Sequence, residues 1–88
     1  MREQIVTVSN RAGIHARPAS TLVRAVQKYN CEVFLERDND RINGKSIMGV
    51  ITLCATYGTK LRVITDGVDE ENAMETIVQL FNSKFEEE

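Results

Sequence analysis

The chain has 88 residues, of which 42% are hydrophobic and 27% charged, and its formal net charge at pH 7 is -2. This length suffices for one hydrophobic core, so we expect a single domain over residues 1–88. A negative charge without a lysine- or arginine-rich run argues against nucleic acid as a partner. No apolar run approaches the roughly 20 residues that span a bilayer, and no signal peptide is visible. We therefore expect a cytoplasmic protein with protein partners and no membrane partner.

The first third of the chain predicts a strand followed by a helix. Residues 3–8 alternate as a half-buried strand does, and residues 10–13 break the pattern. Pro18 then fits the first turn of a helix, where its missing N–H costs nothing. The apolar stripe of that helix, predicted over residues 16–29, consists of Ala19, Leu22, Val23 and Val26.

The middle of the chain predicts a hairpin, a short helix and a further strand. Residues 31–37 and 41–43 flank Asp38-Asn39-Asp40, whose side chains favour turns. A short helix is predicted from Ser46, a natural N-cap, to about residue 55. In the strand predicted over residues 60–65, Leu61 and Val63 point inward and Ile64 departs from the alternation.

A last helix is predicted to begin after Asp69, which is a good N-cap, with Glu70 and Glu71 favouring the positive end of its dipole. Its apolar stripe consists of Ala73, Ile77, Leu80 and Phe81. Glu86 to Glu88 are predicted to form a solvated tail. The element order βαββαβα indicates an α+β domain, with an antiparallel sheet covered by helices on one face.

The sequence offers no pattern for a metal or a cofactor, and we assign neither. Cys31 and Cys54 form no C-x-x-C pair and are expected to be buried thiols. A P-loop ending at Ser46 would need glycine at position 39, which is Asn39. An EF-hand loop starting at Asp38 fails at its fifth and sixth positions.

His15 is the only histidine, and it stands immediately before the predicted helix start with Arg17 two residues on. A neutral imidazole can attack an activated phosphorus without a separate base. The helix N-terminus and the guanidinium of Arg17 would supply donors to the phosphate oxygens. The pattern suits a phosphohistidine, although on spacing alone an ordinary histidine near a helix start is the commoner case.

Ser46 and its neighbours suggest a second functional region. A phosphate on Ser46 would place about -1.5 to -2 charges at a helix N-terminus and act as a switch without refolding. The following helix has more apolar residues than one side can bury, so Met48 is predicted to be exposed in a docking patch. A role for Met48 in filling a gap at the core edge fits the sequence equally well.

Two segments resemble the motifs of HPr, the histidine-containing phosphocarrier of the bacterial phosphoenolpyruvate:sugar phosphotransferase system. Gly-Ile-His-Ala-Arg-Pro-Ala at 13–19 resembles the active-site motif, and Lys-Ser-Ile-Met-Gly-Val at 45–50 resembles the regulatory-serine motif, at matching spacing. The resemblance covers the whole chain. It implies an open-faced β-sandwich, in which three helices lie on one face of four antiparallel strands.

The resemblance also implies a function. His15 would receive phosphate on Nδ1 from enzyme I, charged by phosphoenolpyruvate, and pass it to enzyme IIA components of sugar permeases. Arg17 would coordinate the phosphate and Pro18 would set the helix start. The protein would then be a stoichiometric carrier rather than an enzyme, and we expect it to be a monomer.

Regulation is implied at Ser46, which in many members is phosphorylated by an ATP-dependent HPr kinase/phosphorylase. That modification opposes transfer to the histidine and can create a corepressor for a carbon-catabolite regulator. Gln27 departs from the family pattern where a basic residue often helps partner binding, and Gly44 stands where a bulkier residue is usual. The implied docking face consists of Ser20, Arg24, Ile47, Met48 and Ile51.

Two alternatives remain open. A purely regulatory HPr-like protein would act through Ser46 without sugar transport, but the regulatory branch that lacks the phosphoacceptor histidine is disfavoured by His15. An RNA-binding βαββαβ module has a similar element order. The chain has no RNP1-like run, only 6% aromatic residues and a negative net charge, which argue against that module.

Overall fold

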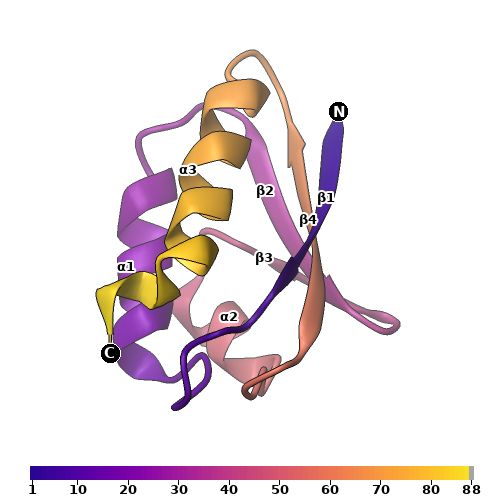
Figure 1. Cartoon of the computed structure of the whole chain (residues 1–88). Helices are drawn as coiled ribbons and strands as arrows, with labels where there is room; N and C mark the ends of the chain where they lie inside the picture. The colour runs from indigo at the N-terminus through magenta and orange to yellow at the C-terminus, as the bar shows by residue number, and fades with distance from the viewer. Residues whose placement is uncertain (88) are drawn as a thin grey trace.

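The computed structural model describes residues 1–87, and its element order confirms βαββαβα with one addition, a final turn of 3₁₀ helix (Figure 1). The elements are β1 (Arg2–Thr7), α1 (Ala16–Val26), β2 (Glu32–Arg37), β3 (Asp40–Asn43), α2 (Ile47–Thr52), β4 (Lys60–Asp66), α3 (Glu70–Asn82) and η1 (Lys84–Glu86). None of the helices in residues 1–87 is long and apolar enough to cross a lipid bilayer.

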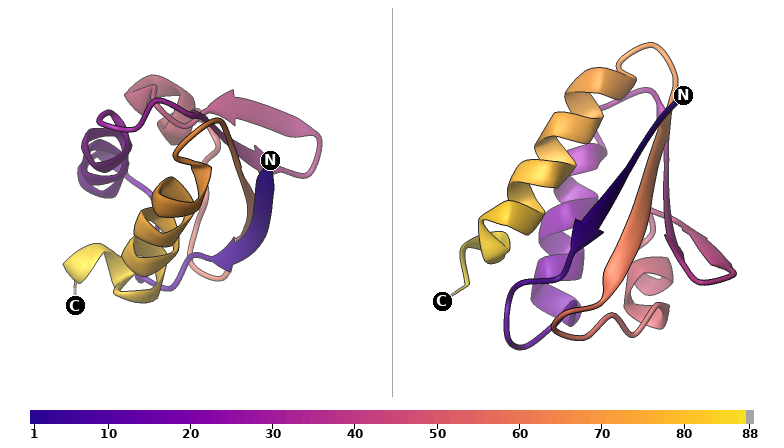
Figure 2. Two further views of the ribbon diagram at one scale, coloured as in Figure 1. Left: turned by 90° about the horizontal axis from the view of Figure 1, so that it is seen from above. Right: turned by 45° about the vertical axis from the view of Figure 1, so that its right-hand side comes forward.

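The four strands form one sheet in the order β1-β4-β2-β3, and every neighbouring pair is antiparallel. Val63 of β4 pairs with Gln4 of β1 on one side and with Leu35 of β2 on the other. The three α-helices lie on one side of the sheet (Figure 2). The predicted open-faced β-sandwich is therefore confirmed.

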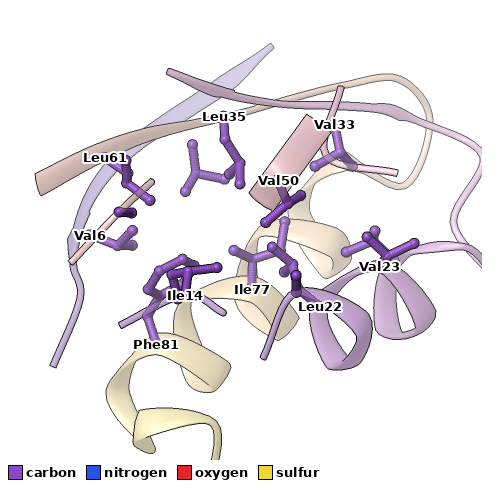
Figure 3. Packing of buried hydrophobic residues seen from close by; sticks show 14 of the residues in the cluster. Val6, Ile14, Leu22, Val23, Val33, Leu35, Val50, Leu61, Ile77 and Phe81 are labelled. Atoms are coloured by element: carbon purple, nitrogen blue, oxygen red, sulfur yellow. The ribbon is translucent and has the colours of Figure 1, made fainter. Parts of the chain in front are cut away.

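The core fills the space between the sheet and the helices (Figure 3). Leu35 and Leu61 from the sheet, and Leu22 and Ile77 from α1 and α3, are at most 1% exposed. Burying a side chain of this size contributes about 1.5–3 kcal/mol. Both predicted helical stripes are buried, except that Leu80 is only partly covered.

The position of Ile64 in the sheet explains why an apolar residue interrupts the alternation of β4. Its neighbours Val63 and Thr65 point into the core, so Ile64 faces the open side of the sheet, yet it is only 2% exposed. Its cross-strand partners are Glu3 and Phe34, which flank it on both sides. Side chains of the open face thus bury an apolar residue without a second layer.

The two cysteines differ, and the prediction that both are buried is wrong for Cys54. Cys31 lies in the core, and burial, followed by a hydrogen bond with Asp69, raises the pKa of its thiol. Cys54 is exposed and adopts a left-handed backbone angle (φ 53°) after the end of α2. Such a left-handed angle lies outside the right-handed helix that was predicted to continue to about residue 55.

Asp69 stands at the N-cap position of α3 as predicted, but its carboxylate does not cap the helix. It accepts instead the backbone N–H groups of Asn30 at 2.8 Å and Cys31 at 2.9 Å. The Asn30 bond is the largest influence, and together these bonds hold the pKa of Asp69 below its usual value. The start of α3 is thereby tied to the segment that enters β2.

The solvated tail predicted for Glu86 to Glu88 is confirmed at Glu86 and is wrong at Glu87. Phe85 is buried against Phe81, edge to face, with their ring centroids 4.9 Å apart. Backbone φ angles of 57°, 54° and 58° at Lys84, Phe85 and Glu86 reverse the chain direction. Glu86 is exposed, but the side chain of Glu87 is only 13% exposed, and Glu88 lies outside the described residues.

Candidate functional site

His15 occupies the N-cap position of α1 with an extended backbone (φ -94°, ψ -164°), and its side chain does not cap the helix. The preceding loop is pinned to the segment between α2 and β4, because the N–H of Ile14 donates to the carbonyl of Ala55 at 2.8 Å. Gly13 (φ 75°) is needed there, since a Cβ would lie 2.8 Å from the same carbonyl oxygen. The imidazole is presented at the surface with 40% of its side chain exposed.

Asn10 closes the loop that precedes the histidine. It is fully buried, and its Nδ2 donates to the carbonyl of Gly13 at 2.7 Å and to Oε1 of Glu87 at 3.0 Å. The N–H of Gly13 donates back to the Asn10 carbonyl at 3.1 Å. Both partners of Nδ2 are acceptors, so the amide orientation is determined by the hydrogen bonds.

A shallow depression of about 490 Å³ opens over the imidazole and is lined by Arg11, Ala12, His15, Arg17 and Glu87. Oε2 of Glu87 lies 3.2 Å from Nε2 of His15 and 3.5 Å from Nε of Arg17. The side chain of Arg17 is 77% exposed, so its guanidinium can turn toward a bound group. The predicted pair His15 and Arg17 is thus brought together at one surface.

This arrangement can hold an anion next to the imidazole. The first N–H groups of a helix have no acceptor within the helix, and α1 begins with Ala16 and Arg17. These groups and the helix dipole favour negative charge, and Arg17 adds charge-assisted donors. Within residues 1–87, no three His, Cys, Asp or Glu side chains gather closely enough to hold a metal ion.

No motif in the sequence points to Asn10 or Glu87 as site residues. A trace of Glu87 is visible in the sequence, because Phe85 interrupts a charged run and an aromatic residue there indicates an anchor to the core. Asn10 gives no comparable signal, since asparagine in a turn is usually explained by local hydrogen bonding.

Ser46 caps α2, as predicted, because its Oγ accepts the N–H of Gly49 at 3.1 Å. Lys45, the residue before Ser46, connects the start of α2 to the end of α1. Lys45 Nζ donates to the carbonyl of Tyr29 at 2.6 Å, and Gln27 Nε2 donates to the carbonyl of Lys45 at 3.0 Å. Gln27, one of the departures from the family pattern, therefore has a structural partner.

The five predicted docking residues lie on α1 and α2, which pack against each other. Met48 is 67% exposed, which confirms its predicted exposure, and Ile47 is 39% exposed. Arg24 is exposed, whereas Ser20 and Ile51 are half-buried. Apolar and cationic groups are therefore both accessible on these two helices.

Fold and site together define a class of small domains in which a half-exposed histidine begins the first helix beside an open-faced sheet. The family model of the PTS HPr component phosphorylation site matches residues 2–83. The chain belongs to this family, the HPr phosphocarrier proteins.

The phosphocarrier protein HPr of Treponema pallidum is 47% identical over 83 residues, which cover 94% of each chain. The crystal structure of HPr-C-His from Thermoanaerobacter tengcongensis is 39% identical with a TM-score of 0.96, covering 100% of this chain and 99% of that one. The catabolite repression protein Crh of Bacillus subtilis, crystallised as a dimer with a swapped domain, is 35% identical with a TM-score of 0.70, covering 98% and 94%.

Proposed function

We propose that the protein accepts a phosphoryl group on Nδ1 of His15 from enzyme I, charged by phosphoenolpyruvate, and passes it to enzyme IIA components. It does so in the cytoplasm as a stoichiometric carrier and not as an enzyme. The observation that supports this most directly is the half-exposed imidazole at the start of α1, within a shallow depression that Arg17 also lines. A partner's phosphorylated group can reach an imidazole so placed.

In the transfer step, the Nδ1 lone pair forms a bond to phosphorus while the bond between phosphorus and the donor's leaving atom breaks. The electron pair of the broken bond returns to the donor. Such a step mainly requires alignment and stabilisation of the charge on the equatorial oxygens. Arg17 and the first N–H groups of α1 are suited to that task, and onward transfer to enzyme IIA reverses the sequence with a new acceptor.

Incubation with phosphoenolpyruvate and a bacterial enzyme I tests the proposal. The protein is expected to gain one phosphate that is stable to base and labile to acid. His15→Ala is expected to abolish the gain while leaving the fold intact, because the imidazole is half-exposed and its side chain makes no cap. No gain in the parent chain, with another HPr as an active control, would refute the carrier proposal.

We further propose that phosphorylation of Ser46 by an HPr kinase/phosphorylase regulates the protein and links it to a carbon-catabolite regulator. A phosphate there would stand beside the exposed Ile47 and Met48 and change what these helices bind. The likeness to Crh supports a link to catabolite repression. A purely regulatory protein is the second candidate, and phosphate transfer to a purified enzyme IIA separates the two.

We also propose that residues 1–88 act as one domain and as a monomer. The core formed by both sheet and helices supports one folding unit. Light scattering of the purified protein is expected to give the mass of one chain. A stable dimer, as in the Crh structure, would contradict this proposal.

A further inference from the structure

Oε2 of Glu87 is a buried carboxylate oxygen that has no hydrogen-bond partner within residues 1–87. Two nitrogen atoms approach it, Nε2 of His15 at 3.2 Å and Nε of Arg17 at 3.5 Å. The other oxygen, Oε1, accepts a hydrogen bond from the buried amide of Asn10. A buried acceptor without a donor is unfavourable, so the ring N–H of His15 is favoured at the position that faces it.

We propose that Glu87, held by Asn10, is a positioning residue that keeps the ring proton of His15 on Nε2. The proposal rests on the proposed phosphocarrier function and concerns how the imidazole is prepared for it. A neutral imidazole has one N–H and one lone pair, and the partner of one nitrogen determines which carries the proton. An ionised carboxylate only accepts. With the proton on Nε2, the lone pair is on Nδ1, the nitrogen that attacks phosphorus.

Glu87 also acts during the transfer step. When the Nδ1 lone pair bonds to phosphorus, the ring becomes cationic and keeps its proton on Nε2. A carboxylate 3.2 Å from Nε2 stabilises this charge as it develops, much as a buried aspartate stabilises the imidazolium of a catalytic triad. The carboxylate contacts the Nε2 edge of the ring, so it does not occupy the position of the incoming phosphorus at Nδ1.

Asn10 joins the carboxylate and the histidine loop in one frame. Its Nδ2 bonds both the carbonyl of Gly13 and Oε1 of Glu87, and the side chain is fully buried. In Asn10→Asp, a carboxylate oxygen would replace the donor Nδ2 and would face two acceptors, the carbonyl of Gly13 and Oε1 of Glu87. Glu87 would then no longer be held beside the ring. Asn10 therefore acts through Glu87 and does not touch the phosphoryl group.

The ring proton can be located by long-range ¹H–¹⁵N NMR of His15 at about pH 9, above the ordinary range of imidazole titration. In the parent chain the Nε2–H tautomer is expected to predominate. Glu87→Ala is expected to give a mixture of the two tautomers, and Glu86→Ala, the exposed neighbour, to match the parent. Glu87→Gln has only one acceptor oxygen, and the buried Asn10 amide already donates to one oxygen of Glu87. The N–H₂ group of the glutamine would then face the ring, so this variant is expected to shift the proton toward Nδ1.

Rates of His15 phosphorylation by enzyme I and phosphoenolpyruvate complete the test. Glu87→Ala is expected to slow the rate by at least about tenfold, as loss of a ring-orienting partner does elsewhere. Glu87→Gln is expected to be slowed as well, since the developing ring charge then lacks its counter-ion. Backbone NMR spectra confirm that each variant is folded.

The two readouts separate this inference from the proposed function. A parent chain with the Nδ1–H tautomer, or Glu87→Ala with an unchanged tautomer, would overturn the positioning role whatever the rates. An unchanged rate in both Glu87 variants would overturn the role in transfer. A parent chain that shows the Nε2–H tautomer but gains no phosphate would leave the positioning role intact and refute the carrier function.

Discussion

The two charged side chains beside His15, Glu87 and Arg17, differ in how firmly the surrounding structure holds them. The Glu87 carboxylate is mostly buried and fixed by a neighbour, whereas the Arg17 guanidinium is mostly exposed. A fixed group suits orientation of the ring, which is needed before and after transfer. An exposed group suits a ligand that arrives and departs, because its movement disturbs no packing.

Arg17→Ala is expected to slow phosphorylation of His15 by about 100-fold, the usual cost of losing one donor to a charged transition state. Arg17→Lys should recover part of the rate, since it restores the charge but not the planar fork. Arg41→Ala, on the open face of the sheet, is the matched control, and transfer kinetics with enzyme I provide the measurement. Equal rates for Arg17→Ala and Arg41→Ala would contradict a role in phosphate binding.

At the scale of elements, α2 combines a cap and a candidate regulatory serine in one residue. The helix has only six residues, so the bond from the Gly49 N–H to Ser46 Oγ is a large part of its local support. Phosphorylation of Ser46 would therefore change the cap and the local charge together.

Three substitutions of Ser46 separate the two effects. Ser46→Ala removes the cap and is expected to lower the free energy of unfolding by about 0.5–2 kcal/mol, whereas Ser46→Asn and Ser46→Asp keep a capping oxygen. Ser46→Asp alone is expected to slow phosphorylation of His15, because it places negative charge beside the exposed Met48. Urea denaturation and transfer kinetics measure these effects, and similar rates for the Asn and Asp variants would remove charge as the cause.

Gly44 lies where the β3–α2 connection passes close to β2. Its N–H donates to the carbonyl of Val33 at 2.7 Å, and a Cβ would lie 2.5 Å from Cγ1 of the same valine. Gly44→Ala is expected to destabilise the fold by about 1–3 kcal/mol. In Gly44→Ala/Val33→Ala the clash is relieved, so the double variant should be more stable than the sum of the single effects in urea denaturation. Strict additivity would show that no clash exists.

The sequence predicted the regular elements well because their apolar spacing reflects burial directly. It failed where the backbone reverses, as at Cys54 and from Lys84 to Glu86, since left-handed angles at ordinary residues leave no pattern. It also failed where a side chain chooses a distant partner, as Asp69 does with Asn30. The residues around the imidazole combine both difficulties, so His15 and Arg17 were predicted, whereas Phe85 was the only indirect sign of Glu87 and Asn10 gave none.

At the scale of the whole molecule, Asp69 links α3 to the start of β2 and makes the stability depend on pH. Its folded-state pKa lies below the ordinary value of 3.8, so its contribution is present above that value and is lost as the pH falls through the folded-state pKa. Glu70, which accepts the N–H of Gly67, has a lowered pKa as well and acts in the same direction. Burial of Cys31 has the opposite sign, so its contribution is lost at alkaline pH.

Asp69→Asn is expected to be less stable than the parent chain at neutral pH, because the N–H groups of Asn30 and Cys31 donate to different carboxylate oxygens and an amide has only one oxygen. Its free energy of unfolding should also fall less steeply from about pH 4 to pH 2, since one linked proton is removed. Urea denaturation across that range measures both effects. Asp38→Asn, in the exposed β2–β3 turn, is the control, and equal slopes in the two variants would contradict the assignment.

The strand order β1-β4-β2-β3 also implies that the histidine site can form only late in the synthesis of the chain. β1 leaves the ribosome first, but its sheet partner is β4, and the loop before His15 is anchored to the carbonyl of Ala55. Glu87 follows later still. A nascent chain that has emerged only as far as the β2–β3 hairpin therefore carries the histidine motif without its anchor, and a protein stalled there would present an imidazole with neither a fixed loop nor a counter-ion.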